Sequence, residues 1–207
     1  RGGGKTLMGA LASWLDSVFK PGCGTKILGG SKEQSQRMYD HLTGDGDGYG
    51  IVQPEFQYLI EGEMLASRTR LVNGANIQIM TASMRSVRGP HPQKLKMDEV
   101  DEIDPRIYEA ALSIPMTKGG IGASTHIFST MHRSYGLMQR IVEDAAGAGF
   151  RLWKWCILDV LEQCVGRDCG ACDLWEDCQG RAVNADGFYS IEDAISKKRQ
   201  VSEQTWK

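Results

Sequence analysis

The spacing of apolar positions alternates along the chain between helical and strand-like patterns. Apolar side chains recur every three or four positions over residues 6–19, which predicts a helix, and Pro21 and Gly22 end the pattern. Residues 26–28 form a short apolar run that predicts a strand, and Ser31 can cap a second helix extending to about residue 42. The alternation continues, with strands expected at 94–97 and 125–129, helices at 105–112 and 135–145, and mixed signals at 152–160.

A hairpin is expected between these segments. Residues 67–72 and 75–81 read as two strands, and Asn73-Gly74 between them readily takes the positive φ angles that a two-residue turn needs. Because the other strands alternate with helices, we expect a mostly parallel sheet with helices on both faces. This domain should occupy residues 1–150, leaving residues 151–207 as a Cys-rich linker.

Length and composition fit this picture and exclude two classes of protein. The 207 residues, 41% of them hydrophobic and 24% charged, suit one sizeable domain with a small appendage. No apolar run approaches the roughly 20 residues that a membrane-spanning helix needs, so no membrane association is expected. The net charge of −2 excludes a globally basic nucleic-acid binder, so any DNA contact has to be local. Because the chain starts at Arg1, inside a motif, we expect a fragment.

The first six residues (RGGGKT) match the end of the Walker A pattern, GxxxxGK followed by Ser or Thr. Glycines let backbone N–H groups approach phosphate oxygens, and the following helix presents its positive end to the same anion. Lys5 would reach the β- and γ-phosphates of ATP, and the Thr6 hydroxyl would bind Mg²⁺. The alternative is a flexible glycine-rich terminus. The expected nucleotide-binding residues of this loop are Gly2, Gly3, Gly4, Lys5 and Thr6.

Two adjacent carboxylates end the strand expected at 94–97, in the manner of a Walker B segment. We expect Asp98 to hold Mg²⁺ through its water shell and Glu99 to orient or deprotonate the attacking water. Lys94 and Lys96 interrupt the apolar pattern, which fits a half-exposed strand as well as a buried one. The alternative is a solvated acidic run; the acids that follow are expected at the surface or at a helix start, namely Asp101, Glu102 and Asp104.

Polar residues at the end of the next strand complete the expected nucleotide site. Ser129 and Thr130 can sense the γ-phosphate, because ligands collect at the carboxyl ends of parallel strands; alternatively, one hydroxyl caps a helix starting near Ser134. Arg85 and Arg88 precede the acidic strand, and either can serve as an arginine that reaches the γ-phosphate of a neighbouring subunit. Together these motifs predict an α/β fold of the P-loop NTPase type, with three α/β/α layers.

These pieces resemble the large subunit of the phage terminases, the DNA-packaging motors of tailed viruses. The matching segments are RGGGKT, ILGGSKEQS, SVRGPHPQKLKMDEVDEID, FST and WKWCILDVLEQC. The resemblance implies that Arg1 and Arg88 serve ATP hydrolysis, and that Ser129 and Thr130 couple it to DNA movement. Members of this family also have an N-terminal strand, an adenine-contacting segment and a C-terminal nuclease domain, none of which this sequence contains. Nuclease activity is therefore not expected, and residues 151–207 would lead towards that domain.

The resemblance also implies partners and a location. Double-stranded DNA would be translocated into a procapsid by a homo-oligomeric ring that binds the portal and the small terminase subunit. The protein would be virus-encoded, in the host cytoplasm and transiently at the procapsid vertex. Two other readings stay open: a helicase-like P-loop ATPase acting on nucleic acid, and a non-catalytic, metal-bound scaffold or DNA-binding module.

Five of the six cysteines crowd between residues 156 and 178, and Cys23 stands alone. This distribution favours metal binding over a disulfide framework. Four thiols in a Cys-x4-Cys-x2-Cys-x5-Cys pattern suit zinc or an iron–sulfur cluster in a small knuckle, with unligated or paired cysteines as the alternative. Cys156 is expected to be a buried strand residue rather than a spare ligand. The four expected ligands are Cys164, Cys169, Cys172 and Cys178.

Overall fold

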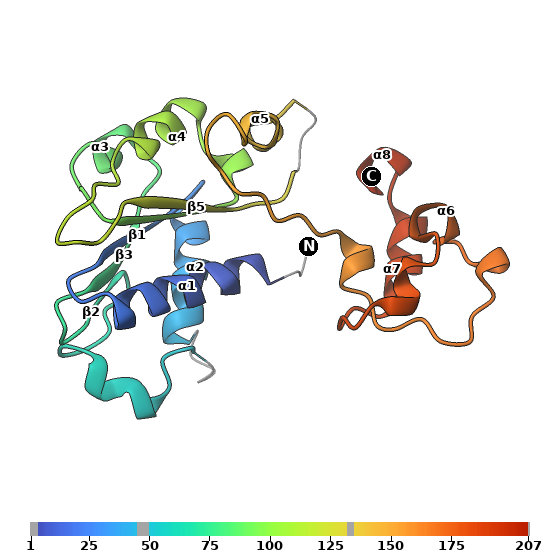
Figure 1. Cartoon of the computed structure of the whole chain (residues 1–207), viewed down its shortest axis with the longest axis horizontal. Coiled ribbons are helices and arrows are strands. Elements are labelled where there is room, and N and C mark those ends of the chain that lie inside the picture. The colour runs from blue at the N-terminus through green and yellow to red at the C-terminus, as the bar shows by residue number, and fades with distance from the viewer. Residues whose placement is uncertain (1–3, 45–49, 132–134, 207) are drawn as a thin grey trace. The chain divides into compact units, whose positions relative to one another are not determined.

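The strands form one five-stranded sheet in the computed structural model, which describes residues 4–44, 50–131 and 135–206. Their order across the sheet is β2-β3-β1-β4-β5 (Figure 1). Only β2 runs antiparallel, to β3, and the other neighbouring strands are parallel. The predicted mostly parallel sheet is therefore confirmed. The strands are β1 (Gly24–Gly29), β2 (Arg68–Arg70), β3 (Asn76–Met80), β4 (Lys94–Asp98) and β5 (Ser124–Phe128).

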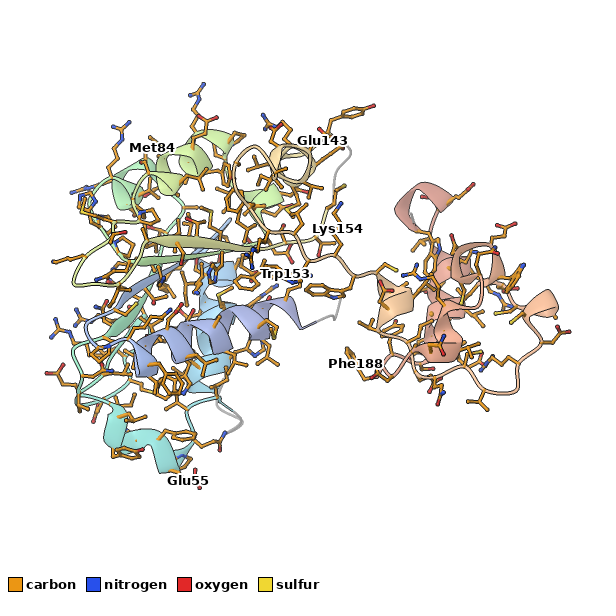
Figure 2. The ribbon with its side chains drawn as sticks, viewed as in Figure 1. Glu55, Met84, Glu143, Trp153, Lys154 and Phe188 are labelled. Atoms are coloured by element: carbon orange, nitrogen blue, oxygen red, sulfur yellow. The ribbon has the colours of Figure 1, made fainter. Side chains whose placement is uncertain are left out.

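Helices cover both faces of this sheet. Helices α1 (Lys5–Phe19) and α2 (Lys32–Thr43) lie on one face (Figure 1). The opposite face carries α3 (Met84–Val87), α4 (Pro105–Leu112) and α5 (Leu137–Asp144), and Figure 2 shows Met84 and Glu143 on that side. Each face has its own hydrophobic core, one containing Ile27 and the other Leu28. The predicted three-layer α/β/α arrangement is confirmed.

Local sequence signals account for where several helices begin. Ser31 and Gln34 form a reciprocal capping box at the start of α2, each side chain bonding the other's backbone N–H. Pro105 occupies the first turn of α4, and the Asp104 side chain accepts a hydrogen bond from the backbone N–H of Arg106. Short 3-10 helices connect further elements of this unit, namely η1 (Pro54–Leu59) and η2 (Val100–Glu102).

The predicted hairpin is present, but its turn differs from the expected one. Strands β2 and β3 pair with Arg70 opposite Asn76, and Gly74 donates a hydrogen bond to the carbonyl of Leu71. Gly74 has φ +84°, whereas Asn73 keeps a negative φ. The connection is therefore longer than a two-residue turn with two positive φ angles, and glycine alone supplies the left-handed residue.

Helix α1 packs on the sheet through its small residues. Ala10 and Ser13 are fully buried, whereas Leu7, Leu11 and Leu15 are exposed by 46%, 37% and 44%. Small side chains let the helix axis approach the strands closely, so the periodic leucines predicted the helix without marking its buried face. This close approach allows a residue in the first turn of α1 to reach β4.

Residues 150–207 form a second unit, separate from residues 4–149. Its core is a small cluster that includes Leu158, Leu161 and Leu174. Residues 152–160 form no strand and contain only a short 3-10 helix, and Cys156 is exposed, so the expectation of a buried strand cysteine is wrong. The elements are η3 (Ile157–Asp159), η4 (Cys169–Ala171), α6 (Trp175–Cys178), η5 (Arg181–Asn184), α7 (Ile191–Gln200) and α8 (Glu203–Trp206). None of the helices in the described ranges is both long and apolar enough to cross a bilayer.

Candidate nucleotide site

The predicted site residues meet where the parallel strands end and α1 begins. The register places Gly29 of β1 beside Asp98 of β4, and Asp98 beside Phe128 of β5. Carboxyl ends of parallel strands next to a helix N-terminus are a common place for ligands in open α/β sheets. The sheet thus brings residues from three separate stretches of sequence to one edge.

The helix end at this edge is suited to an anion. Gly4 precedes α1 with φ +69°, and the first turn of the helix contains no acidic residue. Free backbone N–H groups and the helix dipole give such a terminus a partial positive charge, to which Lys5 adds a full one. Arg1, Gly2 and Gly3 lie outside the described residues. Of the residues predicted to bind phosphate in this loop, Gly4, Lys5 and Thr6 are described in the structure.

Thr6 and Asp98 are in direct contact although they are far apart in the sequence. The Thr6 hydroxyl donates a hydrogen bond of 3.0 Å to Oδ2 of Asp98. The other carboxylate oxygen, Oδ1, is buried and has no hydrogen-bond partner within the described part of the chain. A hydroxyl and a carboxylate are hard oxygen ligands, and the unsatisfied Oδ1 is available to a cation or its water. The two residues predicted to hold Mg²⁺ thus fit a divalent cation.

Burial makes Asp98 difficult to ionise when no cation is bound. Desolvation is the largest influence and, with the adjacent charge of Glu99, raises the pKa of Asp98 to about 6 from 3.8; the Thr6 hydrogen bond and Lys5 oppose this rise. Binding a divalent cation would favour the ionised form. A perturbed carboxylate beside a helix N-terminus is typical of functional sites.

Replacing Asp98 by Asn is expected to stabilise the metal-free chain above pH 6. Because the pKa of Asp98 is higher in the folded state, folding favours its protonated form; that stabilisation is complete below pH 3.8 and is lost as the pH rises through about 6. Asn cannot ionise, so Asp98→Asn should gain about 3 kcal/mol over the original chain at neutral pH and little below pH 3.8. Denaturant unfolding of both chains across this range, without Mg²⁺, measures the difference. A constant difference at every pH would contradict the raised pKa.

Glu99 lies in a backbone conformation that is rare for its residue type. Its φ is +48°, in the left-handed region, and its N–H donates to the carbonyl of Phe128 at 2.9 Å. Such residues carry strain of about 1–3 kcal/mol and concentrate at functional sites. The Thr130 N–H donates to Oε2 of Glu99 at 3.4 Å, a long contact that links the carboxylate to the end of β5. The two motifs predicted to act together are thus neighbours.

Thr130 and Ser129 differ in how far their hydroxyls are engaged. The Thr130 hydroxyl oxygen is buried and lacks a hydrogen-bond partner among the described residues. The same is true of Asp98 Oδ1. The Ser129 hydroxyl donates to the carbonyl of Thr130 at 3.3 Å. Helix α5 starts at Leu137, with Gly136 before it and no side-chain cap, so the alternative that one of these hydroxyls caps it does not hold. Thr130 is the better placed of the two to contact a ligand.

The other charged residues considered in the sequence differ in how exposed they are. Arg85 and Arg88 are exposed on and just after α3, which is compatible with reaching a neighbouring subunit, though their catalytic role stays a prediction. Asp104 caps α4, as expected of a helix-start acid. Asp101 is buried rather than at the surface, but its carboxylate accepts a hydrogen bond of 2.6 Å from the N–H of Met138 in the first turn of α5, which agrees with the alternative of an acid near a helix start. It anchors the start of α5 beside the site.

A buried charged network next to the site was missed from the sequence. Lys96 is fully buried, and its Nζ lies 2.7 Å from Oδ2 of Asp16 and 2.8 Å from Nδ1 of His126. Lys20 bonds the other oxygen of Asp16 at 2.5 Å. Burial and the charge of Lys96 lower the pKa of His126 to about 4, which keeps the imidazole neutral. Strand β4 is buried along its whole length. In the sequence, Lys94, Lys96 and Asp98 alternate with other residues, which places all three on one face of a strand and could have indicated a buried group of charges.

All four predicted metal-ligating cysteines line one cavity in the second unit. Within the described residues, no group of three or more His, Cys, Asp or Glu side chains is already arranged to hold a metal ion. The predicted zinc or iron–sulfur site is therefore not present as a finished coordination sphere.

Comparison with known proteins identifies solved structures with a similar fold. No protein-family model and no curated protein sequence matches the chain. The HK97 bacteriophage large terminase superposes with a TM-score of 0.62 at 14% identity, covering 97% of this chain and 42% of that chain. The Thermus phage P74-26 large terminase ATPase domain gives 0.55 at 13% identity, covering 100% of this chain and 82% of that one. A large terminase from a thermophilic bacteriophage gives 0.53 at 10% identity, with 72% and 37% covered.

These three solved structures are phage large terminases, the family that the sequence resembles. The chain spans less than half the length of two of these terminases. At identities of 10–14% the likeness is one of fold.

Proposed function

We propose that residues 4–149 belong to an ATPase that hydrolyses ATP to move double-stranded DNA, as part of a terminase large subunit. The observation that carries this proposal is the contact between Thr6 and Asp98, which leaves one buried oxygen of Asp98 unsatisfied. Asp98 ends β4 and contacts the first turn of α1, so this oxygen belongs to a residue beside the N-terminus of that helix. A site for a divalent cation therefore adjoins a site for an anion, which is what a metal-bound nucleotide requires.

Each residue has a distinct role in the proposed reaction. Lys5 and the first turn of α1 bind the β- and γ-phosphates, while Thr6 and Asp98 hold Mg²⁺ directly or through water. When bound, Mg²⁺ neutralises phosphate charge. Glu99 orients the attacking water and accepts its proton. Thr130 contacts the γ-phosphate and, through its N–H bond to Glu99, links the state of the nucleotide to the end of β5.

The remaining roles follow from the resemblance to terminases. Arg1 and Arg88 stabilise the charge of the transition state, and Ser129 with Thr130 couples hydrolysis to DNA. A homo-oligomeric ring, the portal, the small terminase subunit and a transient position at the procapsid vertex in the host cytoplasm belong to the same proposal. The cysteine cluster lies in the other unit and takes no part in hydrolysis.

Substituting Lys5 by Met is expected to weaken ATP binding roughly ten- to one-hundred-fold, since a charged hydrogen bond contributes about 1.5–3 kcal/mol. Lys32→Met is the matched control, because Lys32 is also the first residue of a helix next to this sheet and is exposed. Calorimetric titration with ATP and Mg²⁺ measures both affinities. Equal affinities in the two variants would remove Lys5 from the site.

The choice of nucleic acid separates the three readings of the sequence. A packaging ATPase should turn over ATP faster when double-stranded DNA is added. A helicase-like remodeller should respond to single strands or unwind a duplex, and a non-catalytic module should release no phosphate under any of these conditions. Phosphate release with each nucleic acid, at a stated salt concentration, distinguishes them.

A further inference from the structure

Four thiols of the second unit surround one small cavity. Cys164, Cys169, Cys172 and Cys178, the four cavity cysteines, all line it, and none of them forms a disulfide. The cavity has a volume of about 20 Å³. A cavity of about 10–15 Å³ already holds one water molecule. The space among the thiols thus has room for a single ion.

The backbone holds the first and last of these cysteines together. The Cys164 N–H donates to the carbonyl of Ala182 at 2.9 Å, and the Ala182 N–H approaches Sγ of Cys178 at 3.4 Å. Ala182 thereby ties two segments that are separated by a long loop.

The middle cysteines are placed by short turns. Cys169 and Cys172 bracket a single 3-10 turn, with the N–H of Cys172 bonded to the carbonyl of Cys169 at 3.2 Å. After Cys178, the chain reverses through Gln179 and Gly180, which both have positive φ angles. Two residues between cysteines is the spacing at which two sulfurs grip one zinc ion. The turn and the reversal thus lie beside three of the cysteines that line the cavity.

The unit has little else to stabilise it. Its hydrophobic cluster is small, and three of the cavity cysteines, Cys164, Cys172 and Cys178, pack against it. Units of this size bury too little apolar surface to be very stable by themselves and are often reinforced by a metal or by disulfides. Arg167 also lines the cavity and pairs with Glu192 at 2.6 Å.

We propose that the four cavity cysteines bind one zinc ion in a tetrahedral thiolate site that stabilises residues 150–207. Each thiol releases its proton to solvent as its sulfur coordinates the ion, so binding strengthens as the pH rises. In the described structure the four side chains are not arranged to hold a metal ion, so the proposal requires their sulfurs to move together when zinc binds.

Metal analysis of the purified chain, expressed with zinc and iron available, tests this proposal. We expect one zinc ion per chain and no visible absorption. The double variant Cys169→Ser/Cys172→Ser should contain almost no zinc, while Cys156→Ser, an exposed cysteine away from the cavity, should keep the full amount. The proposal would be overturned if the original chain contained no zinc, or if it contained iron and absorbed visible light. It would also be overturned if the double variant kept its zinc.

A second measurement does not depend on the folding of any variant. Removing the metal from the original chain with a chelator should make four additional thiols reactive to a thiol reagent, and adding Co²⁺ should restore their protection. The added Co²⁺ should show the intense visible bands of a tetrahedral thiolate complex. No change in thiol reactivity on chelation would contradict a four-thiolate site, whatever the variants show.

Discussion

Replacing Glu99 by Gln is expected to lower ATP turnover by about one hundred- to ten-thousand-fold, the range by which a positioned general base accelerates proton transfer. The amide has nearly the shape of the carboxylate but cannot accept the proton of the attacking water. The left-handed backbone at Glu99 and its N–H bond to Phe128 would be kept, so the side chain would stay at the strand edge. Steady-state phosphate release with ATP and Mg²⁺ measures the loss.

The affinity for ATP should change little in this variant, because Glu99 acts on water and not on the phosphates. Glu109→Gln provides the matched control, since Glu109 is an exposed glutamate on α4. An unchanged turnover in Glu99→Gln, or an equal loss in the control, would assign catalysis to another group. A loss of ATP binding together with turnover would instead indicate a structural role.

Removing the carboxylate of Asp16 is expected to destabilise the fold by about 3–5 kcal/mol, because a buried charge loses its partner. The charge that would lose its partner is the ammonium of Lys96, which is fully buried between α1 and the sheet. Its remaining neighbour, His126, is neutral and is a poor substitute for an anion. Urea unfolding of the Asp16→Ala chain, followed by circular dichroism, measures the loss.

The reverse substitution should behave very differently. Lys96→Met replaces the cation with an apolar side chain of similar volume, and Asp16 keeps its bond to Lys20 at 2.5 Å. Exchanging buried ion pairs for apolar residues is often neutral or stabilising by about 1–4 kcal/mol. The double variant Asp16→Ala/Lys96→Met should therefore regain most of the stability that Asp16→Ala loses. Additive effects of the two substitutions would show that the residues are not coupled.

The ion pair of Asp16 and Lys96, with His126, connects the three elements that also carry the candidate nucleotide site. Asp16 lies on α1, which begins with Lys5 and Thr6, while Lys96 precedes Asp98 on β4. His126 extends the network to β5, which leads into Thr130. The buried charges therefore fix α1 against the two strands that carry the carboxylates and the γ-phosphate contact. A stability loss at Asp16 should accordingly weaken nucleotide binding as well.

Local patterns in the sequence were sufficient for most of the secondary structure. The spacing of apolar residues identified α1, and Ser31 and Pro105 marked where α2 and α4 begin, because these signals depend on near neighbours in the chain. Where a tertiary contact competes, local signals failed. Leu7 and Leu15 gave α1 its periodicity, yet they are exposed, and the buried residues of the helix include Ala10, Ser13 and Trp14.

By itself, the sequence determined the alternation of strands and helices, the positively charged start of α1 and the acidic pair after β4, since each is a property of consecutive residues. Only the tertiary structure decided that β1 lies between β3 and β4, that Thr6 meets Asp98, and that Lys96 is buried against Asp16. Such contacts join residues distant in sequence, and they depend on strand order and on how closely a helix approaches the sheet. The same distinction holds in the second unit, where spacing predicted a shared ligand but folding alone gathered the four cavity cysteines around one space.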